Sequence, residues 1–313
     1  TTSALGFKAE GTNFTGSLLI GHSTTGTISS AENNTGVGIG ALDALTTGDS
    51  NVAIGFNTLT ALTTGSSNVA IGNKAMLSGL VSGDDNVMIG ELAGNNIIGG
   101  SENVGIGTKA LFTENNDGKN VAVGHNSLMT LRAGADAYNV AVGYDAGKSV
   151  TTAVNNTLIG ALSGDAITTG GYNVALGYGS LSSNTIGNSN IAIGTSAMLT
   201  NVAADRNVAI GTDALESMTA ASTTDTYNVA IGYNAGKQVT SGVENVIIGG
   251  LAGDALTTGS RNIVIGTYAL SNEDGHGNNV AIGWKALQDQ NAGADAYNVA
   301  IGYEAGKEVT TGV

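Results

Sequence analysis

The chain has 313 residues, no cysteine, no proline and a formal net charge of −14, and only 12% of its residues are charged. These values exclude a disulfide-stabilised domain and a cysteine-based metal or thiol site. A chain this acidic also lacks the basic surface that nucleic-acid binding requires, and no apolar run approaches the ~18 residues of a membrane-spanning helix.

Residues 1–35 contain two degenerate copies of a short repeat that becomes regular later in the chain. One copy, Ser-Leu-Leu-Ile-Gly, ends at Gly21, and a fainter one ends at Gly6. We interpret residues 1–35 as the degenerate first coils of a solenoid, where a coil is one turn of the chain around a common axis.

Residues 36–313 carry the regular repeat, whose pattern is Asn-Val-Ala-Ile-Gly-x-x-Ala-Leu. We assign the glycine of its first copy to Gly40 and that of its last copy to Gly302, and the commonest spacing between copies is 17 residues. With the two degenerate copies we count 18 in all. A strand this short must pair with strands of neighbouring coils, so the fixed period predicts an all-β parallel β-solenoid with one copy in each coil.

The Val-Ala-Ile segment predicts a short strand with Val and Ile on one face and Ala on the other. We expect Val and Ile to stack into ladders through the core, Gly to allow a sharp bend and Asn to stack its side-chain amides in register. An aspartate at Ile193 is therefore expected to abolish folding, because it would bury an unpaired charge. The predicted ladder is represented by Asn51, Val52, Ile54, Gly55, Asn68, Ile71, Gly72, Asn190, Ile193, Gly194, Asn279, Ile282 and Gly283.

A longer period overlies the short one. The sequence Ala-Gly-Ala-Asp-Ala-Tyr-Asn-Val-Ala occurs at 133–141 and again, without change, at 292–300. This repetition indicates duplication of blocks of several coils. Both ends of the sequence fall within the repeat pattern, so we expect the chain to be a segment of a longer fibre protein.

No motif in the chain predicts catalysis. The glycines recur in every coil, which favours a structural role over phosphate binding. The pairs Asp84–Asp85 and Glu273–Asp274 lie in connections and lack the spacing of known calcium loops, so turn formation in solvent is the favoured interpretation. Scattered Thr pairs do not form the regular ladder of an ice-binding face. We expect no enzyme activity, no cofactor and no metal.

Aromatic side chains flank the strand in several coils. They lie either directly before the Asn or directly after the Gly of the repeat. Packing at the edge of the core or between chains is the favoured interpretation of these rings, and stacking on a glycan or a receptor is the alternative. The candidate receptor contacts are Tyr138, Tyr144, Tyr227, Tyr233, Trp284, Tyr297 and Tyr303.

The unit Asn-Val-Ala-Ile-Gly-x-x-Ala resembles the YadA-like head repeat of trimeric autotransporter adhesins. It is still more similar to the Asn-Thr-Ala-Val-Gly-Tyr-x-Ala-Leu arrays of bacteriophage tail fibres. The resemblance covers residues 36–313 and implies a left-handed β-roll that assembles as a homotrimer. It further implies an extracellular structural fibre or shaft, of a phage tail or another virion fibre, whose partners are other fibre components and a host-surface glycan or protein.

Two alternatives remain open. The first is the head domain of a bacterial trimeric adhesin at the cell surface, because adhesin heads and virion fibres share the repeat unit. The second is an acyltransferase of the hexapeptide class, whose repeat is similar to Ile-Gly-Thr-Lys-Ala-Leu at 106–111. Those enzymes carry the hexapeptide about three times in each coil and need a general-base histidine, whereas this chain has it once in each coil and has three distant histidines.

Overall fold

The computed structural model describes residues 7–9, 14–21, 28–78, 82–113, 116–219 and 222–312. The chain divides into two units, Thr1–Asn155 (unit 1) and Asn156–Val313 (unit 2). The described residues form only strands, turns and bends, and among them no helix exists that could cross a membrane. The chain makes about 16 turns of about 17 residues each. This confirms the predicted all-β parallel β-solenoid, with fewer turns than the 18 repeat copies counted in the sequence.

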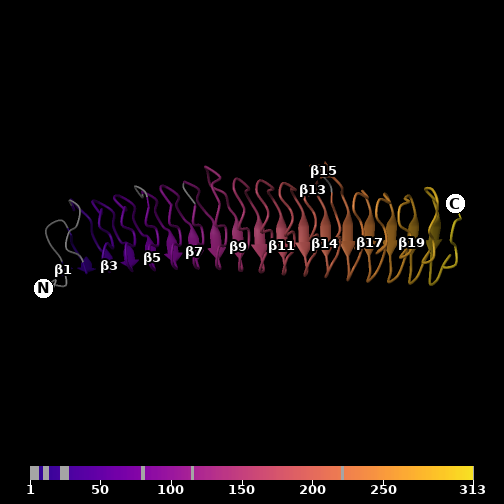
Figure 1. Ribbon diagram of the computed structural model, residues 1–313, viewed down its shortest axis with the longest axis horizontal. Helices are drawn as coiled ribbons and strands as arrows, with labels where there is room; N and C mark the ends of the chain where they lie inside the picture. The colour runs from indigo at the N-terminus through magenta and orange to yellow at the C-terminus, as the bar shows by residue number, and fades with distance from the viewer. Residues whose placement is uncertain are drawn as a thin grey trace. The chain divides into compact units, whose positions relative to one another are not determined.

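Unit 1 contains one short strand in each coil, and neighbouring strands lie side by side (Figure 1). The strands β2 to β9 pair in parallel, whereas β1 runs antiparallel to β2. The faint repeat copy predicted to end at Gly6 lies outside the described residues. The strands are β1 (Phe7–Ala9), β2 (Leu18–Ile20), β3 (Thr35–Val37), β4 (Val52–Ile54), β5 (Val69–Ile71), β6 (Val87–Ile89), β7 (Val104–Ile106), β8 (Val121–Val123) and β9 (Val140–Val142).

Unit 2 repeats this arrangement and adds a second, two-stranded parallel sheet, in which β13 pairs with β15. The strand β15 lies between Gly211 and Gly232, which are 21 residues apart instead of the common 17. The strands are β10 (Thr157–Ile159), β11 (Val174–Leu176), β12 (Ile191–Ile193), β13 (Ala204–Asp205), β14 (Val208–Ile210), β15 (Thr224–Asp225), β16 (Val229–Ile231), β17 (Val246–Ile248), β18 (Ile263–Ile265), β19 (Val280–Ile282) and β20 (Val299–Ile301).

The register of β3 corrects the assignment of Gly40. Val37 pairs with Ile54, so the glycine that follows β3 is Gly38, which has a φ of 136° against 140° at Gly55. Gly40 lies two residues farther on, with a φ of 74°. The interval to Gly55 is therefore 17 residues rather than 15, because the sequence Gly-Val-Gly-Ile-Gly offered three glycines and only strand pairing selects the correct one.

The core of each unit is built from the middle residue of each three-residue strand from β2 onward and from the Ala-Leu segment across the coil. Ala53 and Leu59 of one coil, like Ala192 and Met198 of another, are fully buried. The expectation that Val and Ile form the core is wrong, because the first and third residues of the three-residue strands from β2 onward lie on the outer face and Ile54 is 39% exposed. The interior of a 17-residue coil is narrow, so alanine on the strand leaves room for the longer side chain opposite.

In some coils a glycine at the Leu position accompanies a larger residue in the middle of the strand. Where Gly94 replaces the usual Leu, the middle residue of β6 is Met88, and a β-carbon added at Gly94 would lie 2.8 Å from the Met88 Cγ. Gly164 and Leu158 show the same exchange, also at 2.8 Å. In these two coils a Met or Leu in the middle of the strand thus occupies space that glycine leaves at the facing position, as expected for a close-packed interior.

The Asn that opens each copy is buried and links neighbouring coils. The Asn51 side-chain amide donates to Asn34 Oδ1 at 3.0 Å and to the Gly65 carbonyl oxygen at 2.9 Å, and the Asn51 backbone N–H donates to Asn34 Oδ1 at 2.9 Å. Asn68 makes the same contacts to Asn51. In unit 2, Asn190 and Asn279 are equally buried and bonded. This amide ladder satisfies buried backbone groups that would otherwise be unpaired.

Candidate functional site

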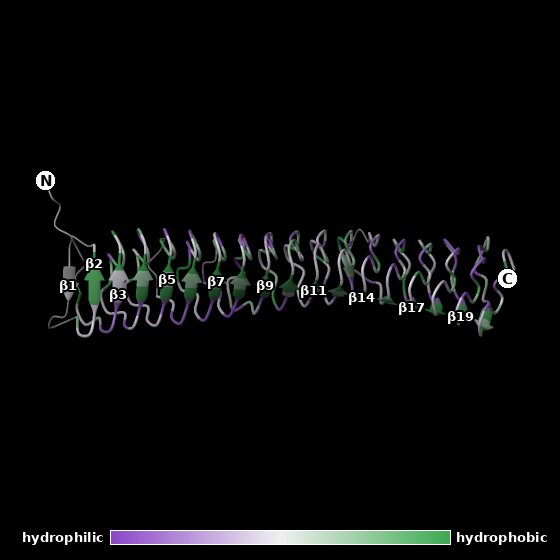
Figure 2. Cartoon of the chain, turned by 90° about the horizontal axis from the view of Figure 1, so that it is seen from below, coloured by the Kyte–Doolittle hydropathy of each residue, from purple (hydrophilic) through white to green (hydrophobic). Residues whose placement is uncertain are grey.

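The outer face of each unit's parallel sheet is apolar. We name it the valine–isoleucine face and define it as the first and third residues of the parallel strands β2–β12, β14 and β16–β20. No charged residue occupies it in the part of the chain that the structure describes, and Thr35 and Thr157 are its only polar residues there. Figure 2 shows the strands as mostly hydrophobic arrows. A contiguous exposed apolar surface of this kind marks an interaction site.

The predicted ladder residues are divided between this face and the interior. Val52, Ile54, Ile71, Ile193 and Ile282 belong to the valine–isoleucine face and are partly exposed. The glycines follow the strands with left-handed φ values: 140° at Gly55, 132° at Gly72, 131° at Gly194 and 135° at Gly283.

None of the candidate receptor rings is buried, because their exposed fractions run from 37% at Trp284 to 73% at Tyr303. Four of them follow the strand glycine, a place we name the post-glycine position: Tyr144, Tyr233, Trp284 and Tyr303. Two pairs stack between neighbouring coils: Trp284 with Tyr303 at 4.8 Å between centroids, and His125 with Tyr144 at 5.4 Å. The rings therefore lie outside the core of their own chain.

The other candidate rings precede the Asn and adopt left-handed backbone angles, with φ of 54° at Tyr138, 49° at Tyr227 and 52° at Tyr297. Tyr138 and Tyr227 each pair with a basic residue of the preceding coil.

Lys119 Nζ lies 5.4 Å from the centroid of the Tyr138 ring and 2.6 Å from Asp136 Oδ2. The hydrogen bond to Asp136 raises the pKa of Lys119. Arg206 lies over Tyr227 in the same way and forms an ion pair with Asp225. The sequence signal for these pairs is an aspartate two residues before the tyrosine.

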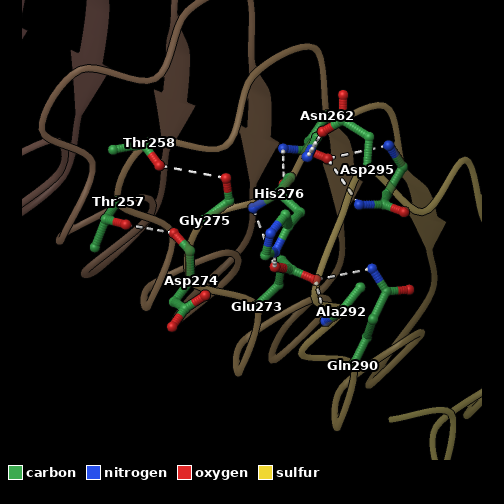
Figure 3. A network of polar contacts seen from close by, with 12 residues as sticks. Thr257, Thr258, Asn262, Glu273, Asp274, Gly275, His276, Gln290, Ala292 and Asp295 are labelled. Carbon is green, nitrogen blue, oxygen red and sulfur yellow. Dashed lines mark hydrogen bonds and ion pairs between the residues drawn. The ribbon is translucent and has the colours of Figure 1, made fainter. Parts of the chain in front are cut away.

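The only group of three metal-ligating side chains in the described part of the chain is Glu273, Asp274 and His276, whose ligand atoms lie within 4.8 Å of one another. Figure 3 shows the polar contacts around this group. Glu273 is fully buried, unlike the solvated turn residue expected from the sequence. Its Oε1 lies 3.1 Å from both the backbone nitrogen and Nδ1 of His276, and its Oε2 accepts from Gln290 Nε2 at 3.0 Å and from the Ala292 N–H at 3.1 Å. Both oxygens thus already have partners, and the carboxylate ties two connections together.

A second buried carboxylate, Asp145, lies beside the His125–Tyr144 stack. Burial opposes its ionisation, but hydrogen bonds from Lys148 at 3.0 Å and from Asn126 at 2.9 Å outweigh burial and lower the pKa of Asp145. The carboxylate therefore stays charged and fixes the start of the connection after β9.

In contrast to Asp145, Asp254 has a buried Oδ1 without a hydrogen-bond partner, and burial raises the pKa of its carboxyl.

Asp254→Ser should stabilise unit 2 at pH 7 by about 1 kcal/mol at most. Serine is the native residue at the equivalent position of the next coil, Ser271. The raised pKa means that wild-type stability falls as pH rises from the ordinary value of 3.8 to the raised value. Urea unfolding at pH 7 and pH 3 tests this, because the gain should vanish at pH 3; an equal gain at both values would show that ionisation is not the cause.

No protein-family model, curated protein sequence or solved structure matches this chain.

Proposed function

We propose that this chain is a structural segment of an extracellular attachment fibre, of a phage tail or another virion, and that it assembles as a homotrimer of left-handed β-rolls. The uncovered valine–isoleucine face is the observation that carries this proposal. The near-17-residue coil and the duplicated block favour a fibre array over the head of a bacterial adhesin, and we propose no catalytic role.

The apolar face favours association with further copies of the same chain. Covering a Val or Ile side chain completely contributes ~1.5–3 kcal/mol relative to leaving it exposed, and the face holds no charge whose desolvation would oppose contact. A second copy offers the same apolar residues at the same spacing between coils, so contacts made in one coil recur in the next. The number three follows from the resemblance of the repeat to trimeric fibres.

The proposal predicts that light scattering of the full chain in dilute buffer gives three times the chain mass of 30.9 kDa. Ile193 lies on the valine–isoleucine face, so Ile193→Asp should disrupt the trimer instead of placing a charge inside the coil. Circular dichroism should still show β structure in the dissociated chain.

Ser189→Asp is the matched control, because Ser189 is exposed and Asp85 occupies the equivalent position with a φ of 58° against 57°. This variant should remain trimeric. A wild-type chain that stays monomeric while folded would contradict the proposal, as would an Ile193→Asp trimer as stable as the wild type.

A further inference from the structure

Trp284 and Tyr303 form one exposed aromatic surface at consecutive post-glycine positions of unit 2. Their ring centroids lie 4.8 Å apart and their planes differ by 21°. The spacing equals the ~4.8 Å between paired strands, so the coil repeat itself places the rings in contact. Lys285 Nζ lies 4.5 Å from the Trp284 ring centroid and 5.9 Å from that of Tyr268. We name Tyr268, Trp284, Lys285 and Tyr303 the ring platform.

We propose that the ring platform binds a pyranose sugar, with the apolar C–H face of the sugar on the Trp284 and Tyr303 rings and its oxygens toward the Lys285 ammonium group. This refines the attachment role proposed above by giving it a ligand class. It is tested separately from the trimer.

The exposure of the rings supports a ligand rather than a packing role within the chain. Tyr303, in the last described coil, is 73% exposed, and Trp284 and Tyr268 are each 37% exposed, so each ring keeps surface outside the core. A pyranose presents axial C–H groups on one face and hydroxyl groups around its edge. Flat rings beside a group with three N–H donors complement both features.

Lys285 is available to such a ligand. None of the ion pairs in the part of the chain that the structure describes includes Lys285, and Glu304 in the next coil pairs instead with Lys307 at 3.3 Å. The ammonium group therefore lies against the aromatic rings with donors left for oxygen atoms of the ligand.

The backbone under the platform is fixed before any ligand binds. The Lys285 N–H donates to the Thr267 carbonyl oxygen at 3.0 Å, and the Glu304 N–H donates to the Trp284 carbonyl oxygen at 2.9 Å. A site held in this way loses little conformational entropy on binding.

The chain supplies its own controls. Tyr178 is also exposed at a post-glycine position, but its neighbours in the adjacent coils are Ala161 and Thr195, so it stands as a single ring. Threonine is native at this position at Thr195 and Thr267, which means that Tyr303→Thr and Tyr178→Thr are expected to fold.

The test uses the intrinsic fluorescence of Trp284, the single tryptophan of the chain. The full-length protein is titrated with methyl β-glucopyranoside, its uronic acid analogue methyl β-glucuronide, and chitotriose. We expect a saturable change in emission with at least one of them. Tyr303→Thr should raise the dissociation constant about tenfold, as expected for the loss of a stacking surface of ~1.4 kcal/mol, whereas Tyr178→Thr should leave it unchanged.

Lys285→Met distinguishes hydroxyl from carboxylate recognition. If the glucuronide binds more tightly than the glucoside and this advantage disappears in the variant, Lys285 binds the carboxylate; an equal loss for both sugars assigns it to hydroxyl groups. No saturable change with any of the three sugars would overturn the proposal. An emission shift that follows protein concentration instead of sugar would also overturn it, by assigning the rings to contact between copies. Light scattering of the same samples reports the trimer independently.

Discussion

Replacing Gly194 by alanine is expected to destabilise unit 2 by more than about 3 kcal/mol, among the largest effects of any single methyl group in this protein. Gly194 has a φ of +131°, which an L-residue rarely adopts, and an added β-carbon would lie 2.5 Å from the oxygen and 2.6 Å from the carbonyl carbon of Gly211 in the next coil. Those atoms are backbone and cannot rotate away. The Gly211 N–H also donates to the Ile193 carbonyl oxygen at 2.7 Å, which holds the two coils at this distance.

Gly250→Ala is the matched control in the same unit. No heavy atom lies within 4 Å of a β-carbon added at Gly250, and its φ is outside the left-handed region. Urea unfolding followed by circular dichroism should place this variant within about 0.5 kcal/mol of the wild type. Equal stabilities for the two variants would show that close approach between coils does not explain the glycine of the repeat.

Asn190→Ala is expected to cost about 2–5 kcal/mol, because it removes a buried side chain that serves both neighbouring coils. Asn190 Oδ1 accepts from the Asn207 backbone N–H at 3.0 Å and from Asn207 Nδ2 at 3.1 Å. Asn190 Nδ2 donates to Asn173 Oδ1 at 3.2 Å and to the Ala204 carbonyl oxygen at 2.8 Å. Alanine would leave the buried Asn207 N–H without an acceptor, and a buried unpaired donor is costly.

Asn190→Ser should recover part of this loss. At the equivalent place in the coil of β2, Ser17 Oγ accepts from the Asn34 backbone N–H at 2.8 Å, so a hydroxyl group can keep the backbone hydrogen bond while losing the amide contacts. The expected order of urea midpoints is wild type, serine, alanine. An alanine variant as stable as the wild type would show that the amide ladder contributes nothing to unit 2.

The repeat in the sequence was sufficient to predict the strands, the glycine bends and the stacked Asn amides. These features are local and recur with a period, so each copy supports the interpretation of the next. Periodicity did not distinguish Gly38 from Gly40 as the glycine that follows β3, because three glycines in five residues left the alignment of this copy ambiguous. Only the pairing of Val37 with Ile54 resolved it.

Alternation in the Val-Ala-Ile strand fixed which residues share a face, but not which face lies inside. The narrow coil decided that, because Ala53 and Leu59 together fill its interior and the larger Val52 and Ile54 must lie outside. The contacts of the connections likewise required three dimensions. The burial of Glu273 and the stacking of Trp284 on Tyr303 join residues from different coils, and their proximity depends on how each connection folds against the next.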